Sequence, residues 1–342
     1  MSVALVTGAT GLVGSHIVER LLADGWSVRA LARSPELARP LLPVEVDIHH
    51  GDVLDQPSFE RAASGCHAVF HAAANIITRG GWEAYRSTNV DGTRNAIQAA
   101  GRAGARLLHV SSVAVYGSGN RYDTARHGKR TDENAPLAAL PDRAYYARSK
   151  RESEDLVLRA HIEGRVWATT VRPCVVYGRR DRQFVPRMAR LISRFPIPLL
   201  RGGRSTLGIV HAVNVADGAV LAATSDVAGG KAYNLANDYD VTVRRFFELA
   251  GSGGGLGRRP TFVPMPMWAA KGALRGAKWL ARALSGGKFT MVSSAAIDFV
   301  SEDNPFSSER AKRELGWSPS VRPETGIPDA FRWWQENKRA RP

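Results

Sequence analysis

A glycine-rich run, Thr7-Gly8-Ala9-Thr10-Gly11-Leu12-Val13-Gly14, constrains the fold of this chain more than any other segment. It follows the apolar stretch Val3 to Val6, which is too short for anything but a buried strand, and it opens a helical pattern of apolar residues that continues to Leu22. A strand, a glycine turn and a helix in this order are the context of a dinucleotide-binding fingerprint. We therefore expect an α/β fold, a Rossmann doubly wound parallel sheet.

Each glycine has its own role in such a turn. Gly8 permits the tight turn, Gly11 lets the backbone approach a pyrophosphate, and Gly14 lets the helix pack closely on the strand. The first helical turn then offers free N–H groups to phosphate. An ordinary strand-to-helix turn is the alternative interpretation. The residues of the run expected to bind a cofactor are Gly8, Thr10, Gly11, Leu12, Val13 and Gly14.

The second expected strand, Ser27 to Ala32, is followed by Arg33 and not by a carboxylate. A dinucleotide fold normally places an acidic residue on the adenine ribose there, roughly 20 residues past the glycines. An arginine instead offers a planar, permanently charged fork to a 2′-phosphate. This favours NADP(H) over NAD(H), unless Arg33 is only a solvated surface charge. Arg29, which faces the same way by strand alternation, either assists Arg33 or faces solvent.

Two later segments continue the alternation of strands and helices. In Gly51-Asp52-Val53, the Asp52 carboxylate is placed at a strand end to accept a hydrogen bond from the adenine amino group, and Val53 lies beside it. The small residues Ala72, Ala73 and Ala74 leave room for the cofactor backbone. His71 precedes them within an apolar strand, where a packed core residue is more common than a catalytic group or a metal ligand. Because no second ligand lies at metal spacing, we expect no metal site.

Two hydroxyl residues, Ser111 and Ser112, follow an apolar strand that begins at Leu107, and we expect them to face the substrate. In an open parallel sheet the carboxyl ends of the strands line the ligand crevice. Residues 144–160 then form a helical pattern in which Tyr146 and Lys150 are four apart and so share a face. A lysine beside a phenol stabilises the phenolate and lowers its pKa, as a proton donor working near neutrality needs. Alone, such a pair is more often structural, but its position after a dinucleotide site favours catalysis.

The order and spacing of these motifs resemble the extended short-chain dehydrogenase/reductases of the NAD-dependent epimerase/dehydratase superfamily, from Val3 to about Gly326. Within that family the chain is most similar to the branch of 3-beta-hydroxysteroid dehydrogenases, dihydroflavonol reductases and reductases of long-chain 3-keto compounds. The matching motifs are Thr7 to Gly14, Gly51-Asp52, His71 to Ala74, Asn89-Val90-Asp91-Gly92-Thr93, Ser111 to Gly117, Tyr146 to Lys150, Arg172-Pro173 to Tyr177-Gly178, and Ala311 to Pro319.

The resemblance implies a role for each matching residue. Tyr146 would give or take the proton at the substrate oxygen, and Ser112 would hydrogen-bond the carbonyl. Lys150 would bond the nicotinamide ribose and tune Tyr146. The cofactor supplies the hydride, and the protein supplies orientation and a preorganised donor pair. The full set implied to bind cofactor adds Arg33, Asp52, Val53, Ala72, Ala73, Ala74, Tyr146, Lys150 and Pro173 to the glycine run.

Two other functions stay open at this stage. A nucleotide-sugar epimerase or dehydratase would usually carry an arginine for the substrate pyrophosphate just before the strand Gly208 to His211, where this chain has Ser205-Thr206-Leu207, although Arg204 is near. A non-catalytic NADP(H)-sensing module would not need the Tyr146 and Lys150 pair. We therefore expect an NADP(H)-dependent oxidoreductase that interconverts a ketone and a secondary alcohol on a sizeable apolar substrate.

The length of 342 residues suggests two lobes. We expect a dinucleotide-binding domain over residues 1–178, to which 206–236 returns, and a smaller, mostly helical substrate lobe from 179–205 and 237–342. Residues 117–143, which are polar and Gly-rich, are expected to form a loop across the crevice mouth. Helices around 83–104 and 144–160 resemble the pair through which family members dimerise, which implies a homodimer.

Cysteine usage and hydropathy bear on where the protein works. Cys66 and Cys174 lie in separate segments without metal or disulfide spacing, which suggests a reducing compartment. No signal peptide precedes the first strand, and no apolar run reaches the roughly 18 residues of a membrane span. These observations predict a cytoplasmic protein.

The net charge of +15 lies mainly after residue 150, where 30 Lys and Arg face 18 Asp and Glu. No motif indicates nucleic-acid binding. Residues 268–284 have the pattern of a basic amphipathic helix with interfacial tryptophans. Packing on its own domain is the favoured interpretation, and a lid over an apolar site or a membrane-surface contact is the alternative. On one side of this helix we expect Lys271, Arg275, Lys278 and Arg282, flanked by Trp268 and Trp279, with Leu280 and Leu284 opposite.

Overall fold

Seven parallel strands form the central sheet in the order β10-β6-β5-β4-β1-β2-β3. The computed structural model describes residues 2–76, 81–117, 130–236, 238–252, 256, 259–270, 272 and 299–338. The strand order changes direction between β1 and β4, which is where an open α/β sheet places its ligand crevice. The bounds are β1 Val3–Thr7, β2 Ser27–Ala32, β3 Asp47–His50, β4 Ala68–His71, β5 Arg106–Val110, β6 Ala168–Pro173 and β10 Ala232–Leu235.

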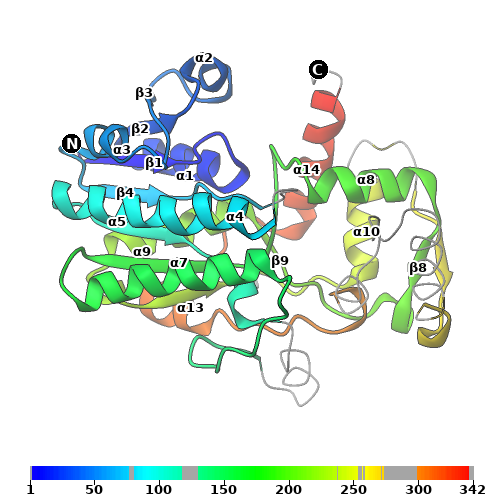
Figure 1. Cartoon of the computed structure of the whole chain (residues 1–342). Helices are drawn as coiled ribbons and strands as arrows, with labels where there is room; N and C mark the ends of the chain where they lie inside the picture. Colours follow the sequence, from blue (N-terminus) through cyan, green and yellow to red (C-terminus); the bar gives the residue numbers. More distant parts are fainter. Residues whose placement is uncertain are drawn as a thin grey trace.

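Helices cover both faces of this sheet (Figure 1). Because successive side chains of a strand point to opposite faces, Ala4 and Val6 of β1 pack with Ile17 of α1, whereas Leu5 packs with Phe59 of α3. Helices α1 and α9 lie on the first face, and α3, α5 and α7 lie on the second. The bounds are α1 Leu12–Ala23, α2 Pro35–Ala38, α3 Gln56–Ala63, α4 Gly81–Tyr85, α5 Gly92–Ala103, α7 Tyr145–Ile162, α8 Phe184–Arg194, α9 Ala212–Thr224, α10 Val243–Ser252, α13 Glu309–Leu315 and α14 Pro323–Asn337.

A smaller, mostly helical part packs α8, α10 and α14 around a core of its own that includes Ile192, Phe246 and Phe331. Two short parallel pairs complete it, β8 (Ile197–Leu199) with β11 (Phe262–Pro264), and β7 (Val175–Tyr177) with β9 (Ile209–His211). After β9 the chain returns through α9 to β10 at the edge of the main sheet.

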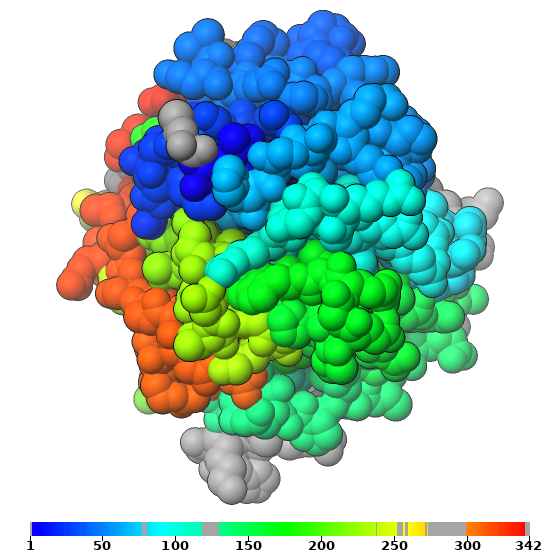
Figure 2. Space-filling view, turned by 90° about the vertical axis from the view of Figure 1, so that its left-hand side faces the viewer, coloured from blue at the N-terminus to red at the C-terminus, as the bar shows by residue number. Residues whose placement is uncertain are grey.

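The carboxyl ends of the sheet strands face this smaller part. The amino terminus, where β1 begins, lies at the left of Figure 1, and α8, α10 and β8 lie at the right. Since all seven strands are parallel, their carboxyl ends point to the right. Figure 2 shows the left-hand side of Figure 1, away from the smaller part. Segments coloured blue to green form a rounded face there, beside α9 and α13.

The expected Rossmann fold with a smaller helical part is confirmed, and the strand Ser27–Ala32 is confirmed residue for residue. The helix expected over 144–160 is α7. The helix expected around 83–104 is divided into α4, a π-helical turn Arg86–Asp91 and α5. Most of two other predicted segments lies outside the described residues, which include only 117 and 130–143 of the loop, and only 268–270 and 272 of the amphipathic helix. Within the described part of the chain, every helix is too short or too polar to traverse a lipid bilayer.

Gly14 is the point where α1 meets the turn after β1. A Cβ built on Gly14 would overlap the Gly8 carbonyl, with the Gly8 carbonyl carbon 2.7 Å away. We expect Gly14→Ala to lower the free energy of unfolding by about 3 kcal/mol, because both atoms belong to backbone and neither moves without shifting the helix. Urea unfolding measures this.

Gly11→Ala is the matched control. Its Cβ would meet only the Gly8 oxygen, at 3.1 Å, and the Gly11 φ of −82° suits any residue. We expect Gly11→Ala to leave the free energy of unfolding nearly unchanged. Equal losses in the two variants would show that helix packing does not explain Gly14.

Candidate active site

The candidate site residues gather at the carboxyl ends of β1, β4 and β5, next to the beginnings of α1 and α7. Thr7 ends β1, His71 ends β4, and Val110 ends β5, two residues before Ser112. On α7, Tyr146 stands in the first turn and Lys150 in the second. The sheet topology thus brings the glycine turn and the Ser112, Tyr146 and Lys150 side chains to one edge.

The glycine turn is packed directly on the loop after β4. Gly8 has a φ of +67°, and a Cβ there would lie 2.8 Å from the Ala73 nitrogen and 2.9 Å from the Ala72 carbonyl carbon. The Gly11 N–H closes the turn on the Gly8 oxygen at 2.9 Å. Gly11 then caps α1 without any side-chain hydrogen bond, so the first-turn N–H groups of Leu12, Val13 and Gly14 have no partner within the helix. Such a helix end suits a phosphate group.

Thr7 ties the end of β1 to the end of β4. Its hydroxyl oxygen lies 2.9 Å from His71 Nδ1 and accepts a hydrogen bond from the Ala73 N–H at 3.3 Å. His71 is fully buried, in keeping with a packed residue, and burial together with the Lys150 charge lowers its pKa to about 3. Ala72, Ala73 and Ala74 are half-buried, so the loop presents backbone and methyl groups beside the glycine turn.

Arg33 and Arg29 do not act together. Arg33 is exposed just past β2, and it makes no hydrogen bond or ion pair with another residue of the described structure. The Arg29 guanidinium instead donates to the carbonyl oxygens of Ala62 and Ser64 at 3.1 and 2.6 Å. Arg29 is half-buried and is held by carbonyl acceptors from α3 and the turn after it, which the strand pattern alone does not reveal.

Asp52 and Val53 lie after β3, at the neighbouring edge of the sheet. One Asp52 carboxylate oxygen accepts a hydrogen bond from the Leu54 N–H at 3.0 Å, which forms a tight turn and leaves the carboxylate half-buried. The Val53 side chain packs against Gly92, where a Cβ would come within 3.1 Å of a Val53 methyl, and the Val53 carbonyl accepts from Asn95. Pro173, at the end of β6, is buried and pairs in register with Leu235 of β10.

Ser112 begins the 3-10 turn Val113–Tyr116. It has extended backbone, and its hydroxyl accepts a hydrogen bond from the Ala114 N–H at 3.2 Å. Ser112 is also near enough to Tyr146 to lower the pKa of that phenol. Ser111 is different, because its hydroxyl is buried and lacks a hydrogen-bond partner among the described residues. The structure therefore joins Ser112, and not Ser111, to Tyr146.

Burial raises the pKa of Tyr146, and the nearby Ser112 side chain lowers it by less. This is opposite to the lowered pKa expected from the Tyr146 and Lys150 spacing, because desolvation disfavours the phenolate. A further phenol, Tyr85, also works to raise the pKa, and its ring centroid is 6.4 Å from that of Tyr146. Tyr146 is consequently a neutral proton donor near pH 7.

Lys150 is buried, and its ammonium donates to the Val110 carbonyl at 2.7 Å. Burial lowers the pKa of Lys150 to about 8, against the opposing effect of the Glu154 carboxylate. Beneath it, the His71 and His109 rings stack at 5.6 Å. Burial and the Lys150 charge lower the pKa of His109 as well. Both histidines are therefore neutral and add no positive charge next to the Lys150 ammonium.

Asn89 is a site residue to which the sequence pattern assigned no role. Its side-chain oxygen accepts from the Asn75 N–H at 2.6 Å, and its amide donates to the Asn75 carbonyl and to the Ser149 hydroxyl. Ser149 in turn donates to the Tyr146 carbonyl. Asn89 therefore holds the loop after β4 against the first turn of α7. It lies in the motif Asn89 to Thr93, and the π-helical turn that aims it inward has no local sequence signal.

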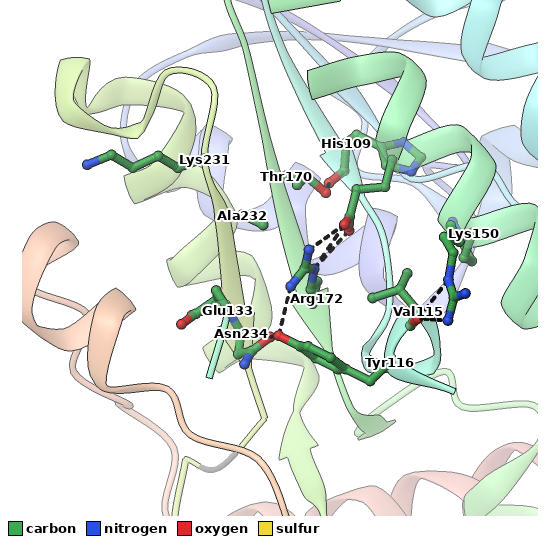
Figure 3. A network of polar contacts seen from close by, with 12 residues as sticks. His109, Val115, Tyr116, Glu133, Lys150, Thr170, Arg172, Lys231, Ala232 and Asn234 are labelled. Carbon is green, nitrogen blue, oxygen red and sulfur yellow. Dashed lines mark hydrogen bonds and ion pairs between the residues drawn. The ribbon is translucent and has the colours of Figure 1, made fainter. Parts of the chain in front are cut away.

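Figure 3 shows a second group that sequence reasoning missed, a buried chain of Arg172, Tyr116 and Asn234. Arg172 is bound by Glu154, which stands four residues after Lys150. The same helical spacing that joined Tyr146 to Lys150 would have placed Glu154 on that face.

A nucleotide-sugar enzyme would usually carry an arginine just before β9. The residues directly before β9 in this chain are not basic. Leu207, just before β9, is buried in the core of the smaller part. Thr206 is bound to the Asp303 carboxylate through its N–H and hydroxyl. Arg204 is exposed.

These residues fit a nicotinamide dinucleotide. A side chain at Gly8 or Gly11 would fill the space at the glycine turn. The uncapped first turn of α1 supplies N–H donors for the phosphates of the dinucleotide. Lys150 and Tyr146 supply a cation and a neutral hydroxyl at the same edge of the sheet.

Comparison with known proteins agrees with this fit. Residues 4–236 match the family model described as NAD dependent epimerase/dehydratase family. The chain is 31% identical to the 4-hydroxy-2-methyl-3-oxo-4-farnesyl-3,4-dihydroquinoline-1-oxide ketoreductase of Stigmatella aurantiaca, over 96% of this chain and 95% of the relative. It is 28% identical to the 3-beta-hydroxysteroid dehydrogenase of Mycolicibacterium neoaurum, over 97% and 91% of the two chains. The crystal structure of gox2253 aligns with a TM-score of 0.76 at 27% identity and 99% coverage of both chains.

The buried Lys150 charge is expected to lower the free energy of unfolding. Because its pKa is about 8 in the folded protein and 10.5 ordinarily, the unfolded chain holds the proton more tightly. The cost of burying the charge is fully present below pH 8 and disappears as the pH rises to 10.5. We expect Lys150→Met to raise the free energy of unfolding at pH 7 by about 2 kcal/mol, and the gain to vanish near pH 10.5.

Urea unfolding at both pH values measures this difference. Lys231→Met is the control, because Lys231 is half-exposed and paired with Glu314 at 2.9 Å. It should give no gain. A Lys150→Met protein less stable than the wild type at pH 7 would contradict the prediction.

Proposed function

The chain belongs to the NAD dependent epimerase/dehydratase family of NAD(P)-dependent enzymes, and we propose that it is an NADP(H)-dependent oxidoreductase that interconverts a ketone and a secondary alcohol on a sizeable apolar substrate. The observation that carries the proposal is the convergence of three groups, Ser112 at the turn after β5, Tyr146 in the first turn of α7, and the buried Lys150 ammonium one helical turn further on. Two hydroxyl donors beside a buried cation are suited to an oxygen on which negative charge develops.

In the reducing direction, the bound nicotinamide supplies a hydride to the carbonyl carbon. Ser112 donates a hydrogen bond to the carbonyl oxygen and orients it. Tyr146, which is neutral because burial raises its pKa, transfers its proton to that oxygen. The Lys150 ammonium, with a pKa of about 8, stabilises the phenolate that remains until a proton returns from solvent.

The preference for NADP(H) is supported by Arg33. Its guanidinium is exposed beside the glycine turn, at the strand end where a carboxylate would repel a 2′-phosphate. Asp52 and Val53 would flank the adenine from the next strand end, and Pro173 would line the nicotinamide side.

The apolar substrate is supported by the relatives and by Leu207. A ketoreductase of a farnesylated quinoline oxide and a 3-beta-hydroxysteroid dehydrogenase both match nearly the whole chain. Leu207 is buried near the position where a sugar-nucleotide enzyme would place an arginine, which disfavours a nucleotide-sugar epimerase or dehydratase. We assign substrate binding to 179–205 and 237–342, and dimer formation to α5 and α7. The proposal includes a cytoplasmic location, with 268–284 packed on its own domain and a lid or a membrane-surface contact as the alternatives.

Replacement of Tyr146 by Phe tests the proton donor. Purified wild-type protein should oxidise NADPH at 340 nm with a steroid ketone, a long-chain 3-keto acid or a flavonoid ketone. Tyr146→Phe should lower kcat at least about 100-fold while NADPH still binds, because only the transferable proton is lost.

Tyr145→Phe is its matched control. Tyr145 is the preceding residue and lies about 100° away on the helix, with its ring toward Trp82 and Tyr85. It should keep near-normal kcat. Turnover only of nucleotide sugars would overturn the proposal in favour of an epimerase, and tight NADPH binding without any turnover would favour a sensing module.

Replacement of Arg33 by Ser tests the cofactor preference. We expect the Kd for NADPH to rise about tenfold, since a charge-assisted pair with the 2′-phosphate is lost, and the Kd for NADH to stay unchanged. Fluorescence titration of the reduced cofactors measures both values. Arg102→Ser, an exposed arginine at the far end of α5, is the control. If Arg33→Ser weakens the binding of NADH and NADPH equally, Arg33 does not bind the 2′-phosphate.

A further inference from the structure

A buried ion pair lies on the inner side of α7, next to the candidate site. The Arg172 guanidinium on β6 donates to the Glu154 carboxylate on α7 at 3.1, 3.0 and 2.5 Å. Both side chains are buried, with exposed fractions of 7% and 5%. Such a pair is costly to desolvate, and apolar residues of the same volume often give equal stability. Stability alone therefore does not account for an ion pair at this position.

The pair continues into Tyr116. Arg172 donates to the Tyr116 hydroxyl at 2.7 Å, and that hydroxyl lies 2.9 Å from the Asn234 side-chain oxygen and 3.0 Å from the Asp132 carbonyl. Asn234 is itself held in place, because its backbone N–H donates to the buried Glu133 carboxylate at 2.7 Å. Figure 3 shows this chain of side chains crossing from α7 over β6 to β10.

Tyr116 is the last residue of the 3-10 turn that Ser112 begins. The turn is held at a second point, where the Arg151 guanidinium donates to the Val115 carbonyl at 3.0 and 2.6 Å. Glu154, Arg151, Lys150 and Tyr146 all stand on α7. The contacts therefore fix the Ser112 turn to the same helix that carries the proton donor.

Glu154 also faces Lys150 along the helix. The other groups around Lys150 are His71 on β4 and His109 on β5, and both are neutral. Arg172 on β6 is bound to Glu154. Tyr146 on its own helix is neutral too. Among the described residues, Glu154 is the carboxylate whose charge acts on Lys150.

We propose that Glu154, Arg172 and Tyr116 are positioning residues, which together set the Ser112 hydroxyl against Tyr146 and hold a compensating charge beside Lys150. The inference rests on the proposed function and adds three residues that touch neither substrate nor cofactor. They act through the turn and the helix they join. Removing the Tyr116 hydroxyl frees one end of the Ser112 turn, and removing the Glu154 charge leaves Lys150 without its carboxylate.

Tyr116→Phe tests the link to Ser112. We expect kcat to fall about tenfold with KM and the NADPH Kd within twofold, because the donor pair is misplaced while binding is kept. In cofactor-free protein, the pKa of Tyr146 should rise further as the Ser112 side chain, which lowers it, is displaced. Tyrosine ¹³Cζ NMR measures it, with the resonance assigned by its loss in Tyr146→Phe.

Tyr233→Phe is the matched control, because it also removes a hydroxyl from a buried tyrosine, one bound to Glu314 at 3.0 Å at the sheet edge. It should leave kcat and the Tyr146 resonance unchanged. If Tyr116→Phe leaves both unchanged, or if Tyr233→Phe lowers kcat as much, the positioning role is wrong.

Glu154→Gln tests the charge beside Lys150. Lysine ¹³Cε NMR of cofactor-free protein, assigned with Lys150→Met, should show the pKa of Lys150 falling by about one unit from about 8. Glu152→Gln is the control, since Glu152 on the same helix is paired with Arg148 at the surface. Equal pKa values in both variants would overturn the inference.

If Glu154→Gln does not fold, the Tyr116→Phe results decide alone. Should the wild-type protein reduce no ketone, the proposed function fails, and the two NMR titrations still decide whether these residues position Tyr146 and Lys150.

Discussion

The close approach of Gly14 to the Gly8 carbonyl is the contact on which the geometry of the site depends. With no Cβ between them, the first turn of α1 lies directly over the end of β1. Gly8 in turn lies on the backbone of Ala72 and Ala73, after β4. β1 and β4 are the two strands at which the strand order changes direction. The helix end that we propose to bind phosphate and the edge that carries the proposed proton-transfer groups are thereby joined through backbone contacts alone.

Around that framework, the site is built by burying polar groups, several of which have a defined partner. Thr7 meets His71, Lys150 meets the Val110 carbonyl, and Asn89 meets Asn75. Burial moves the pKa of Tyr146 up and that of Lys150 down, so that a neutral donor and a readily neutralised cation stand one helical turn apart. The same desolvation that costs stability supplies the acid–base properties.

The features predicted from the sequence are those with local signals. The glycine run, the strand Ser27–Ala32 and the shared face of Tyr146 and Lys150 each follow from spacing within a few residues. The partner of Arg29 is instead set by carbonyl groups after α3, and the direction of the Tyr146 pKa shift is set by how deeply the folded chain covers it. No local pattern contains either fact, since both arise when distant segments pack.

The return of the chain to the sheet has a consequence for biosynthesis. β6 pairs with β10 only after the chain has passed through the smaller part and α9, so β6 is an open sheet edge until residues 232–235 leave the ribosome. The delay is on the order of several seconds at ordinary rates of translation. Asn234, which anchors Tyr116, arrives with the same strand. During this interval the nascent chain therefore carries an unpaired β6 edge, the kind of edge at which chains aggregate.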